Sequence, residues 1–267
     1  MDKNPLVTTD AWQSLRSATP ARIALGRAGG SLPTREWLDF KSAHSAARDA
    51  VHQAFDAESL AEELSALGVE TILLDTAAGD RQTHLQRPDF GRRLDAASEA
   101  HLRARADQHA APDLAIIVSD GLSALAVQRQ VPPLLARLLP RLTGDGWRLA
   151  PIAVVRFGRV ALEDQIGQLF GARLALALIG ERPGLGAPDS LGAYLVHAPQ
   201  PGNTDANRNC VSNIRPAGLG WDAAADTILY LLAESRRRQL SGVGLKDERC
   251  LAPPVRPMLS EQSSQTS

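Results

Sequence analysis

The chain has 267 residues, of which 44% are apolar, so it can form one or two globular domains with a sizeable core. Its 29 lysine and arginine residues nearly balance its 30 aspartate and glutamate residues, so the overall charge does not indicate binding to nucleic acid or to an anionic membrane. The longest apolar runs are far shorter than the ~20 residues that span a bilayer, and the amino terminus lacks a basic-then-apolar signal pattern. These features predict a cytoplasmic protein.

Composition and periodicity divide the chain into parts of different character. Residues 1–18 are polar and irregular and are expected to form an amino-terminal arm. Residues 19–110 are expected to form a smaller, mainly helical region, and residues 111–245 a Rossmann-like α/β domain. Residues 246–267 have the composition of a flexible tail.

The helical region is expected to hold a long amphipathic helix, from Arg35 to about Phe55, followed by a short strand in TILLD. His44 and His52 lie on the polar stripe of this helix. They are eight residues apart, which is too far for one metal ion, so solvated surface or a subunit contact is favoured over a metal site.

A polar loop, RPDFGRR over residues 87–93, gathers three arginines around a proline turn. Two interpretations stay open: an ordinary surface loop, or a grip on an anion or on an acidic partner surface. A phosphate-loop lysine does not follow, so a nucleoside triphosphatase is not indicated.

From Asp113 onward, apolar runs alternate with segments of helical period. This alternation predicts an α/β fold with a Rossmann-like, mostly parallel sheet and flanking helices. Neither GLSALA nor GERPGLG is a GxGxxG fingerprint, so a nicotinamide cofactor has no support. Strands are expected in LAIIVS, WRLAPIAVVRF, RLALALIG and LGAYLVHA, two consecutive helices over residues 122–144, one helix in ALEDQIGQLFG, a long polar loop after LGAYLVHA, and a last helix from about Asp222 to Leu240.

The stretch from Val154 to Pro183 is a strand-helix-strand unit at the centre of this series. Parallel strands end at the same edge of a sheet, so the turns at residues 158–160 and 180–184 are expected to lie side by side as a ligand-binding rim. The alternative is that their glycines only permit tight turns.

Polar side chains are dense in the later loops GERPGLGAPDS and PGNTDANRNCVSNIRPAG, which suits a large polar ligand. Cys210 has no histidine among its sequence neighbours, so a contact role is favoured over a nucleophilic one. Cys210 and Cys250 are the two cysteines, without a CxxC pair, so reduced thiols are expected and a disulfide framework or metal site is not. A serine hydrolase lacks its G-x-S-x-G elbow.

Several motifs, in their order and spacing, resemble the small (light) subunit of ethanolamine ammonia-lyase: RPDFGRRL, SDGLSALAVQ, RFGRVALEDQIGQLFGA, IGERPGLGAPDSLGAYLVHAP, NRNCVSNIRP and SGVGLKD. The resemblance covers roughly Thr19 to Asp247. It implies a carbon-nitrogen lyase that uses adenosylcobalamin to convert ethanolamine to acetaldehyde and ammonia. In that family the large subunit is a TIM barrel with the substrate site, and the small subunit completes the cobalamin site within a hetero-oligomer.

The same resemblance implies cobalamin contacts at Val160, Glu181 and Cys210, and a catalytic role for none of them. For Glu181 the alternative is an ion pair with Arg159 or Arg182 that only shapes the turn. The chain lacks a DxHxxG sequence, which suits a cobalamin that keeps its own dimethylbenzimidazole base.

The resemblance also has implications for the location of the protein in the cell. Enteric family members have a longer amino-terminal extension that directs them to a protein-shelled microcompartment, and the short arm here puts such encapsulation in doubt. A free-standing Rossmann-like nucleotide-binding enzyme or module is the alternative function. The sequence offers it neither a general base nor a phosphate motif.

Overall fold

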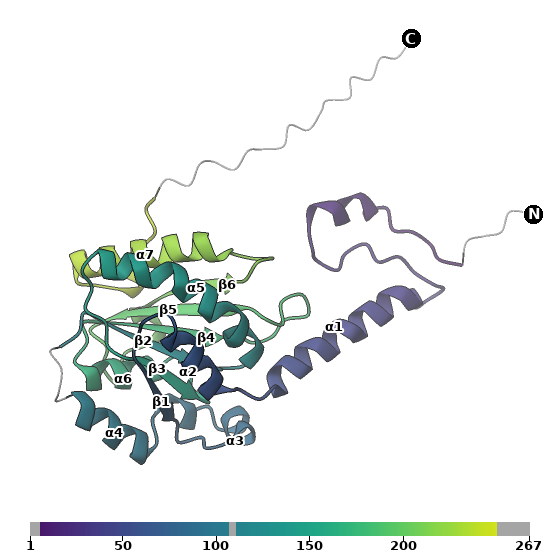
Figure 1. Ribbon diagram of the computed structural model, residues 1–267. Helices are drawn as coiled ribbons and strands as arrows, with labels where there is room; N and C mark the ends of the chain where they lie inside the picture. Colours follow the sequence, from purple (N-terminus) through teal and green to yellow (C-terminus); the bar gives the residue numbers. More distant parts are fainter. Residues whose placement is uncertain (1–5, 107–110, 250–267) are drawn as a thin grey trace, which may run out of the picture.

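The computed structural model describes residues 6–106 and 111–249, so Cys250 and most of the expected tail lie outside the described residues. Its centre is a six-stranded sheet with the order β1-β3-β2-β4-β5-β6 (Figure 1). Strands β1, β3, β2 and β4 are parallel, whereas β5 and β6 are antiparallel to their neighbours, which confirms the expected α/β fold. The strands are β1 (Thr71–Asp75), β2 (Leu114–Ser119), β3 (Ile152–Arg156), β4 (Leu174–Gly180), β5 (Leu191–His197) and β6 (Arg208–Ile214).

Helices cover both faces of this sheet. Helices α2, α5 and α7 pack against one face, and α4 and α6 pack against the other (Figure 1). Within the described ranges, none of the helices has the length and apolar character needed to cross a membrane. The α-helices are α1 (Thr34–His52), α2 (Ala57–Ser65), α3 (Arg81–Gln86), α4 (Ala96–Ala106), α5 (Ala124–Gly144), α6 (Leu162–Phe170) and α7 (Trp221–Arg238), and short 3-10 helices lie at Gln13–Ala18, Phe90–Arg92, Asp205–Asn207 and Gly242–Gly244.

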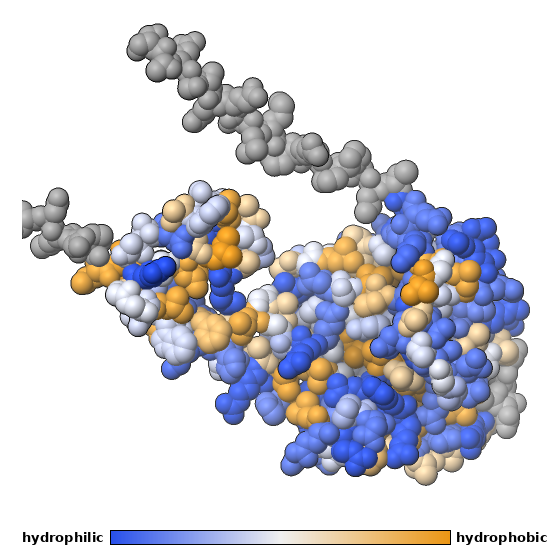
Figure 2. Space-filling view, turned by 180° about the vertical axis from the view of Figure 1, so that it is seen from behind, coloured by the Kyte–Doolittle hydropathy of each residue, from blue (hydrophilic) through white to orange (hydrophobic). Residues whose placement is uncertain are grey.

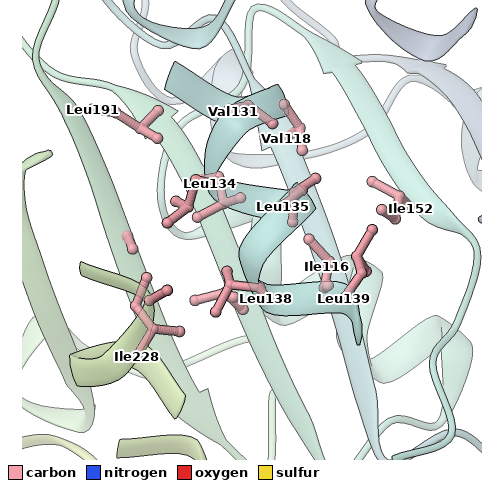
Figure 3. Close-up of a cluster of buried hydrophobic side chains, with 14 of the residues drawn as sticks. Ile116, Val118, Val131, Leu134, Leu135, Leu138, Leu139, Ile152, Leu191 and Ile228 are labelled. Carbon is pink, nitrogen blue, oxygen red and sulfur yellow. The ribbon is translucent and has the colours of Figure 1, made fainter. Parts of the chain in front are cut away.

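Side chains alternate between the two faces along each strand, which creates one core on either side of the sheet. On β4, Leu176 and Leu178 join the core under α5 and α7, whereas Ala175 and Ala177 join the core under α6. The alanines let α6 lie close to the sheet, since a Cβ atom on Gly167 of α6 would be 3.2 Å from that of Ala175. On the opposite face, Figure 3 shows the leucines of α5 lying over the strands.

Helix α5 is continuous, so the prediction of two consecutive helices over residues 122–144 is wrong. Pro132, Pro133 and Pro140 all lie inside it. A proline in a helix interior costs about 3 kcal/mol, because it removes a hydrogen bond and crowds the preceding turn. The burial of leucines such as Leu134 and Leu138, which lie between Pro133 and Pro140, contributes about 1.5–3 kcal/mol for each side chain, which offsets this cost.

Strand β1 is the edge strand of the sheet. It was expected as a strand, but within the mainly helical region that precedes residue 111. The structure pairs it in parallel with β3, with Thr71 opposite Ile152 and Asp75 opposite Arg156. The sheet therefore extends into the region before residue 111.

The segment before α1, together with α1 itself, stands away from the sheet (Figure 1). The segment is attached to the start of α1 by an ion pair between Arg16 and Glu36, at 3.1 Å. Large apolar side chains are exposed on this part: Trp12 is 67% exposed, Trp37 is 45% and Leu38 is 58%. Figure 2 shows the corresponding apolar patches on the projecting part.

Candidate functional site

The turns after β3 and β4 share the carboxyl edge of the sheet, but they are not side by side as expected. Strand β2 lies between β3 and β4 and pairs with both. Neighbouring strands are about 4.8 Å apart, so the two turns start about 10 Å from each other. A crossover helix can pass over an intervening strand, and the sequence of one strand-helix-strand unit does not reveal whether it does.

The turn after β3 begins with a backbone conformation that is rare for an aromatic residue. Phe157 has a φ of 61°, in the left-handed region. Its N–H donates to Asp120 Oδ1 at 2.7 Å, and its carbonyl oxygen accepts from Thr76 Oγ1 at 3.1 Å. The next N–H, of Gly158, donates to Ser119 Oγ at 2.8 Å. These contacts from β1 and β2 hold the turn that carries Val160.

Asp120, which directly follows β2, is buried behind this turn. Its carboxylate forms an ion pair with Arg81 Nη1 at 2.8 Å. Burial raises the pKa of Asp120 to about 6, although the charge of Arg81 acts in the opposite direction. Arg81 also donates to the carbonyl oxygens of Gly121 and Val51, each at 2.8 Å. Neither Arg81 nor Asp120 is predicted as a site residue from the sequence; the signal for Asp120 is its place directly after a buried strand.

His84 completes this buried group. Its Nδ1 lies 2.8 Å from the carbonyl oxygen of Phe157, and its Nε2 lies 2.8 Å from that of Gly121. Burial lowers the pKa of His84 to about 4, and the nearby charges of Arg159 and Arg81 add to this effect. The neutral ring can donate to only one of the two carbonyl oxygens.

Val160 lies at the far side of the turn, half-buried against the core under α6. It lines a surface pocket of about 510 Å³ together with Arg92, Arg159, Arg208 and the segment 203–205. Val160, a predicted contact residue, thus lies in a pocket rich in arginine, and such a pocket can bind a polar ligand.

Glu181 directly follows β4, and its carboxylate binds to a residue directly before β5 and to one on β6. Its Oε2 accepts from the Ser190 hydroxyl and, at 3.3 Å, from the N–H of Asn213, so the alternative partners Arg159 and Arg182 are not the ones used. Within the described chain, Oε1 accepts no hydrogen bond and is available to a ligand.

A glycine makes room for the Glu181 side chain. A Cβ atom on Gly192 would lie 3.0 Å from Glu181 Oε1 and 2.9 Å from Cε2 of Tyr194. Glu181 and Tyr194 therefore lie on the same face of the sheet, over a position that carries no side chain.

Cys210 lies on strand β6, so the expectation of a loop there is wrong. It is opposite Tyr194 in the antiparallel pair with β5, and it is exposed. The sequence hides this edge strand because only Val211 and Ile214 enter the core. A bulge at Asn213, which has a φ of 58°, also interrupts the alternation.

The Cys210 thiol lies beside Tyr194, the residue opposite it on β5. Desolvation raises the pKa of the thiol above its ordinary value, and the nearby carboxylates of Glu181 and Glu163 act in the same direction. The side chain is therefore a neutral thiol at pH 7, which suits a contact role and not a nucleophilic one.

Arg208 links β6 to α6, the helix that follows Val160, through ion pairs. It lies two residues before Cys210 on the same face, and its buried guanidinium forms ion pairs with Glu163 and Asp164 in the first turn of α6. Burial raises the pKa of both carboxyl groups, in Glu163 well above its ordinary value. The Val160 turn and the Cys210 strand are thus fixed relative to each other.

The structure brings two of the three predicted contact residues together. Glu181 and Cys210 flank Tyr194, which is not predicted as a site residue from the sequence; its signal is a polar hydroxyl within the apolar run LGAYLVHA. Val160 lies apart from them, on the turn after β3, which β2 separates from the turn after β4. The arrangement offers hydrogen-bonding groups spread over a wide surface, which is suited to holding a large polar ligand.

Comparison with known proteins identifies the family. Residues 9–246 match the family model of the ethanolamine ammonia-lyase light chain (EutC). The ethanolamine ammonia-lyase small subunit of Azotobacter vinelandii is 56% identical over 248 residues, 92% of this chain and 92% of that protein. Those of Pseudomonas putida W619 and Ralstonia nicotianae are 54% and 55% identical over 249 and 247 residues, which are 93% and 92% of this chain and 92% of each relative. The chain therefore belongs to the ethanolamine ammonia-lyase light-chain family.

Proposed function

We propose that this chain is the small subunit of an adenosylcobalamin-dependent ethanolamine ammonia-lyase. The proposed enzyme is a carbon-nitrogen lyase that converts ethanolamine to acetaldehyde and ammonia. The observation that carries the proposal is the family match over residues 9–246, a range that includes every strand of the sheet and both turns at its carboxyl edge. The name shared by the relatives, small subunit, supports a large subunit as partner in a hetero-oligomer.

The residues at the carboxyl edge fit a cobalamin. A corrin ring carries amide side chains that donate and accept hydrogen bonds, and Glu181 Oε1 is an acceptor without a partner among the described residues. Arg159 Nε is a buried donor that lacks an acceptor in the described ranges. Cys210 lies on an exposed part of the sheet face beside Glu181. We infer that Val160, Glu181 and Cys210 contact the cofactor.

Adenosylcobalamin would supply the radical chemistry of the reaction. The role of this chain is to hold and enclose the cofactor. Glu181 would orient an amide side chain of the ring, the Cys210 thiol would cover it, and the Val160 turn would exclude water. The described residues at this edge offer no paired base and nucleophile, so we assign the substrate site to the large subunit, a TIM barrel in this proposal.

The projecting part of the chain is the surface that we assign to the large subunit. Trp12, Trp37 and Leu38 are exposed there, and aromatic residues are enriched at protein interfaces. Their burial in a complex would remove this apolar surface from water. A cytoplasmic location for the complex is part of the proposal.

The proposal is tested by producing this chain with and without its large subunit. We expect ammonia release from ethanolamine only when both chains and adenosylcobalamin are present. Ammonia release by this chain alone would contradict the division of labour. Failure of the two chains to co-purify, together with tight binding of a nucleotide by this chain alone, would favour a free-standing nucleotide-binding module instead.

A further inference from the structure

Positive charge accumulates beside the Val160 turn. Arg81 and Arg92 lie close enough to Arg159 for their charges to act on it. Arg81 has a carboxylate partner in Asp120, at 2.8 Å. Over the described ranges, neither Arg92 nor Arg159 forms an ion pair.

Arg159 is the central member of this group. Its Nη2 donates to the carbonyl oxygen of His84 at 2.8 Å, and its Nε is buried without an acceptor among the described residues. Burial lowers the pKa of Arg159, and the charges of Arg81 and Arg92 add to this effect. The Asp120 carboxylate acts in the opposite direction, but Asp120 is paired with Arg81, so one carboxylate faces several guanidinium groups. A partly buried cation without an ion-pair partner of its own is costly, and an anion bound beside it would offset that cost.

The pocket next to Val160 is the place for such an anion. Arg92 and Arg159 both line it, as do Asn203 and Thr204, which have polar side chains. A third lining arginine is engaged by buried carboxylates of α6 and does not count toward the excess charge. Asp205 is the one carboxylate among the residues described as lining this pocket, and it is exposed.

We propose that this pocket binds the phosphodiester of the nucleotide loop of adenosylcobalamin, and this inference rests on the cofactor proposed above. The phosphodiester is the anionic group of the cobalamin, and a guanidinium offers paired N–H donors that match two phosphate oxygens. Val160, which lines the same pocket, is a proposed cofactor contact, so the nucleotide loop would lie within reach.

The neighbouring arginines of the loop at residues 87–93 are occupied in other ways. Arg87 pairs with Asp89 at 2.8 Å, and Arg93 stacks on the ring of Phe90 at 4.9 Å from its centroid. Arg92 alone among the three lines the pocket beside Val160. Of the two interpretations left open for this loop, the grip on an anion is therefore the one that we assign to Arg92.

The test compares adenosylcobalamin with adenosylcobinamide, which lacks the phosphate and the nucleotide. Both are titrated into the apo complex of this chain with its large subunit, and binding is followed by the absorbance of the corrinoid. Arg92→Gln and Arg159→Gln should each raise the dissociation constant for adenosylcobalamin about tenfold or more, since each removes a charged hydrogen bond. The dissociation constant for adenosylcobinamide should change less than about twofold, and the penalty for adenosylcobalamin should shrink as salt is added.

Arg93→Gln is the matched control, since this neighbour of Arg92 is exposed and does not line the pocket. It should leave both dissociation constants unchanged. Arg92 is also exposed, so its replacement should not disturb folding even if that of Arg159 does.

Three results would overturn the phosphate site. The first is an equal loss of affinity for both corrinoids, and the second is no loss for either while Glu181→Ala still weakens binding. The third is dissociation of the subunits in Arg92→Gln, which would assign the pocket to a carboxylate of the large subunit. If the wild-type complex bound neither corrinoid, the proposed cofactor role itself would fail, and the phosphate site with it.

Discussion

At the scale of single residues, Glu181 has both a structural role and a proposed ligand-binding role, one for each oxygen of its carboxylate. Oε2 is used within the protein, whereas Oε1 accepts no hydrogen bond from the described residues. Loss of a hydrogen bond to a bound ligand typically costs about 1–3 kcal/mol. Glu181→Ala should therefore raise the dissociation constant for adenosylcobalamin about tenfold to a hundredfold in the assembled complex.

Ser190→Ala is the matched control for this variant. It removes the hydrogen bond from the Ser190 hydroxyl to the carboxylate and leaves Oε1 in place. Each variant should lower the free energy of unfolding by about 1 kcal/mol, but only Glu181→Ala should weaken cofactor binding. Equal losses of affinity in the two variants would show that the carboxylate acts only by shaping the turn.

A second prediction at this scale concerns His84 and the pH dependence of the free energy of unfolding. Its pKa is about 4 in the folded protein against 6.5 for the ordinary side chain, so the unfolded chain binds the proton more readily. The wild type should lose stability as the pH falls from about 6.5 to about 4, by about 3 kcal/mol in all. His84→Gln lacks this proton, so the stability difference between wild type and variant should move in favour of the variant over that range.

The check is denaturant unfolding of the two proteins at several pH values between 4 and 7. A stability difference that stays constant with pH would mean that His84 has the same pKa in the folded and unfolded protein. A difference that moves in favour of the wild type as the pH falls would mean that the folded ring is protonated, with both nitrogens donating to the carbonyl oxygens that face them. The pKa of the Asp120 carboxyl is raised to about 6, above its ordinary value of 3.8. Asp120 therefore lowers the stability of the folded protein as the pH rises through this range, which is opposite to the effect of His84. Its contribution cancels in this comparison because both proteins keep it.

At the scale of elements, Arg208 connects β6 to α6. Its guanidinium is buried and faces two buried carboxyl groups, those of Glu163 and Asp164. Removal of one partner from a buried ion pair typically costs about 3–5 kcal/mol. Arg208→Met should therefore lower the free energy of unfolding by about that amount, as measured in denaturant. Arg237→Met, which removes an exposed ion pair with Glu234, should cost less than about 1 kcal/mol.

A small effect of Arg208→Met, comparable to that of the exposed control, would contradict this connection. It would mean that the carboxyl groups of α6 are neutral in the folded protein and need no cation. The Val160 turn and the Cys210 strand would then be held together by apolar contacts alone.

The same elements show what the sequence could and could not predict. Strand β4 was predictable, because every one of its residues is buried and a continuous apolar run results. Strand β6 was not, because at the edge of the sheet it needs few apolar side chains and its bulge breaks the period. Helix α5 was predicted as two helices that meet at Pro132. The effect of a proline on a helix is visible in the local sequence, whereas the burial that offsets it depends on tertiary packing.

The candidate site, too, was predictable in part. Glu181 was correctly placed at the carboxyl edge, because that position depends only on the end of a buried strand. Its distance from the Val160 turn was not predictable, because the strand between them comes from an earlier part of the chain. Arg81 and His84 reach Asp120 and Phe157 from a separate helix, and a contact of this kind leaves no local pattern in a sequence.

At the scale of the whole molecule, the projecting α1 predicts how the chain assembles. Trp37 stacks on Phe40 at 5.8 Å between ring centroids, and Phe40 on His44 at 6.2 Å, so the exposed rings form an ordered ladder. Truncation of a central aromatic residue in an interface typically costs about 2 kcal/mol or more. Trp37→Ala should weaken association with the large subunit about thirtyfold or more, as measured by sedimentation of the two chains.

Asp39→Ala is the control for this surface, because Asp39 is an exposed residue close to Trp37 in the same helix. It should leave association nearly unchanged. Unaltered association in Trp37→Ala would place the large subunit on another face of the molecule.

We propose that this chain completes a cobalamin site in a two-subunit lyase. A high-resolution density map of the complex with adenosylcobalamin bound tests it most directly. We expect the corrin ring at the carboxyl edge of the sheet, with an amide side chain within hydrogen-bonding distance of Glu181 Oε1 and with Val160 and Cys210 in contact with the cofactor. Density for the cofactor enclosed entirely by the large subunit, with this edge of the sheet left in solvent, would contradict it.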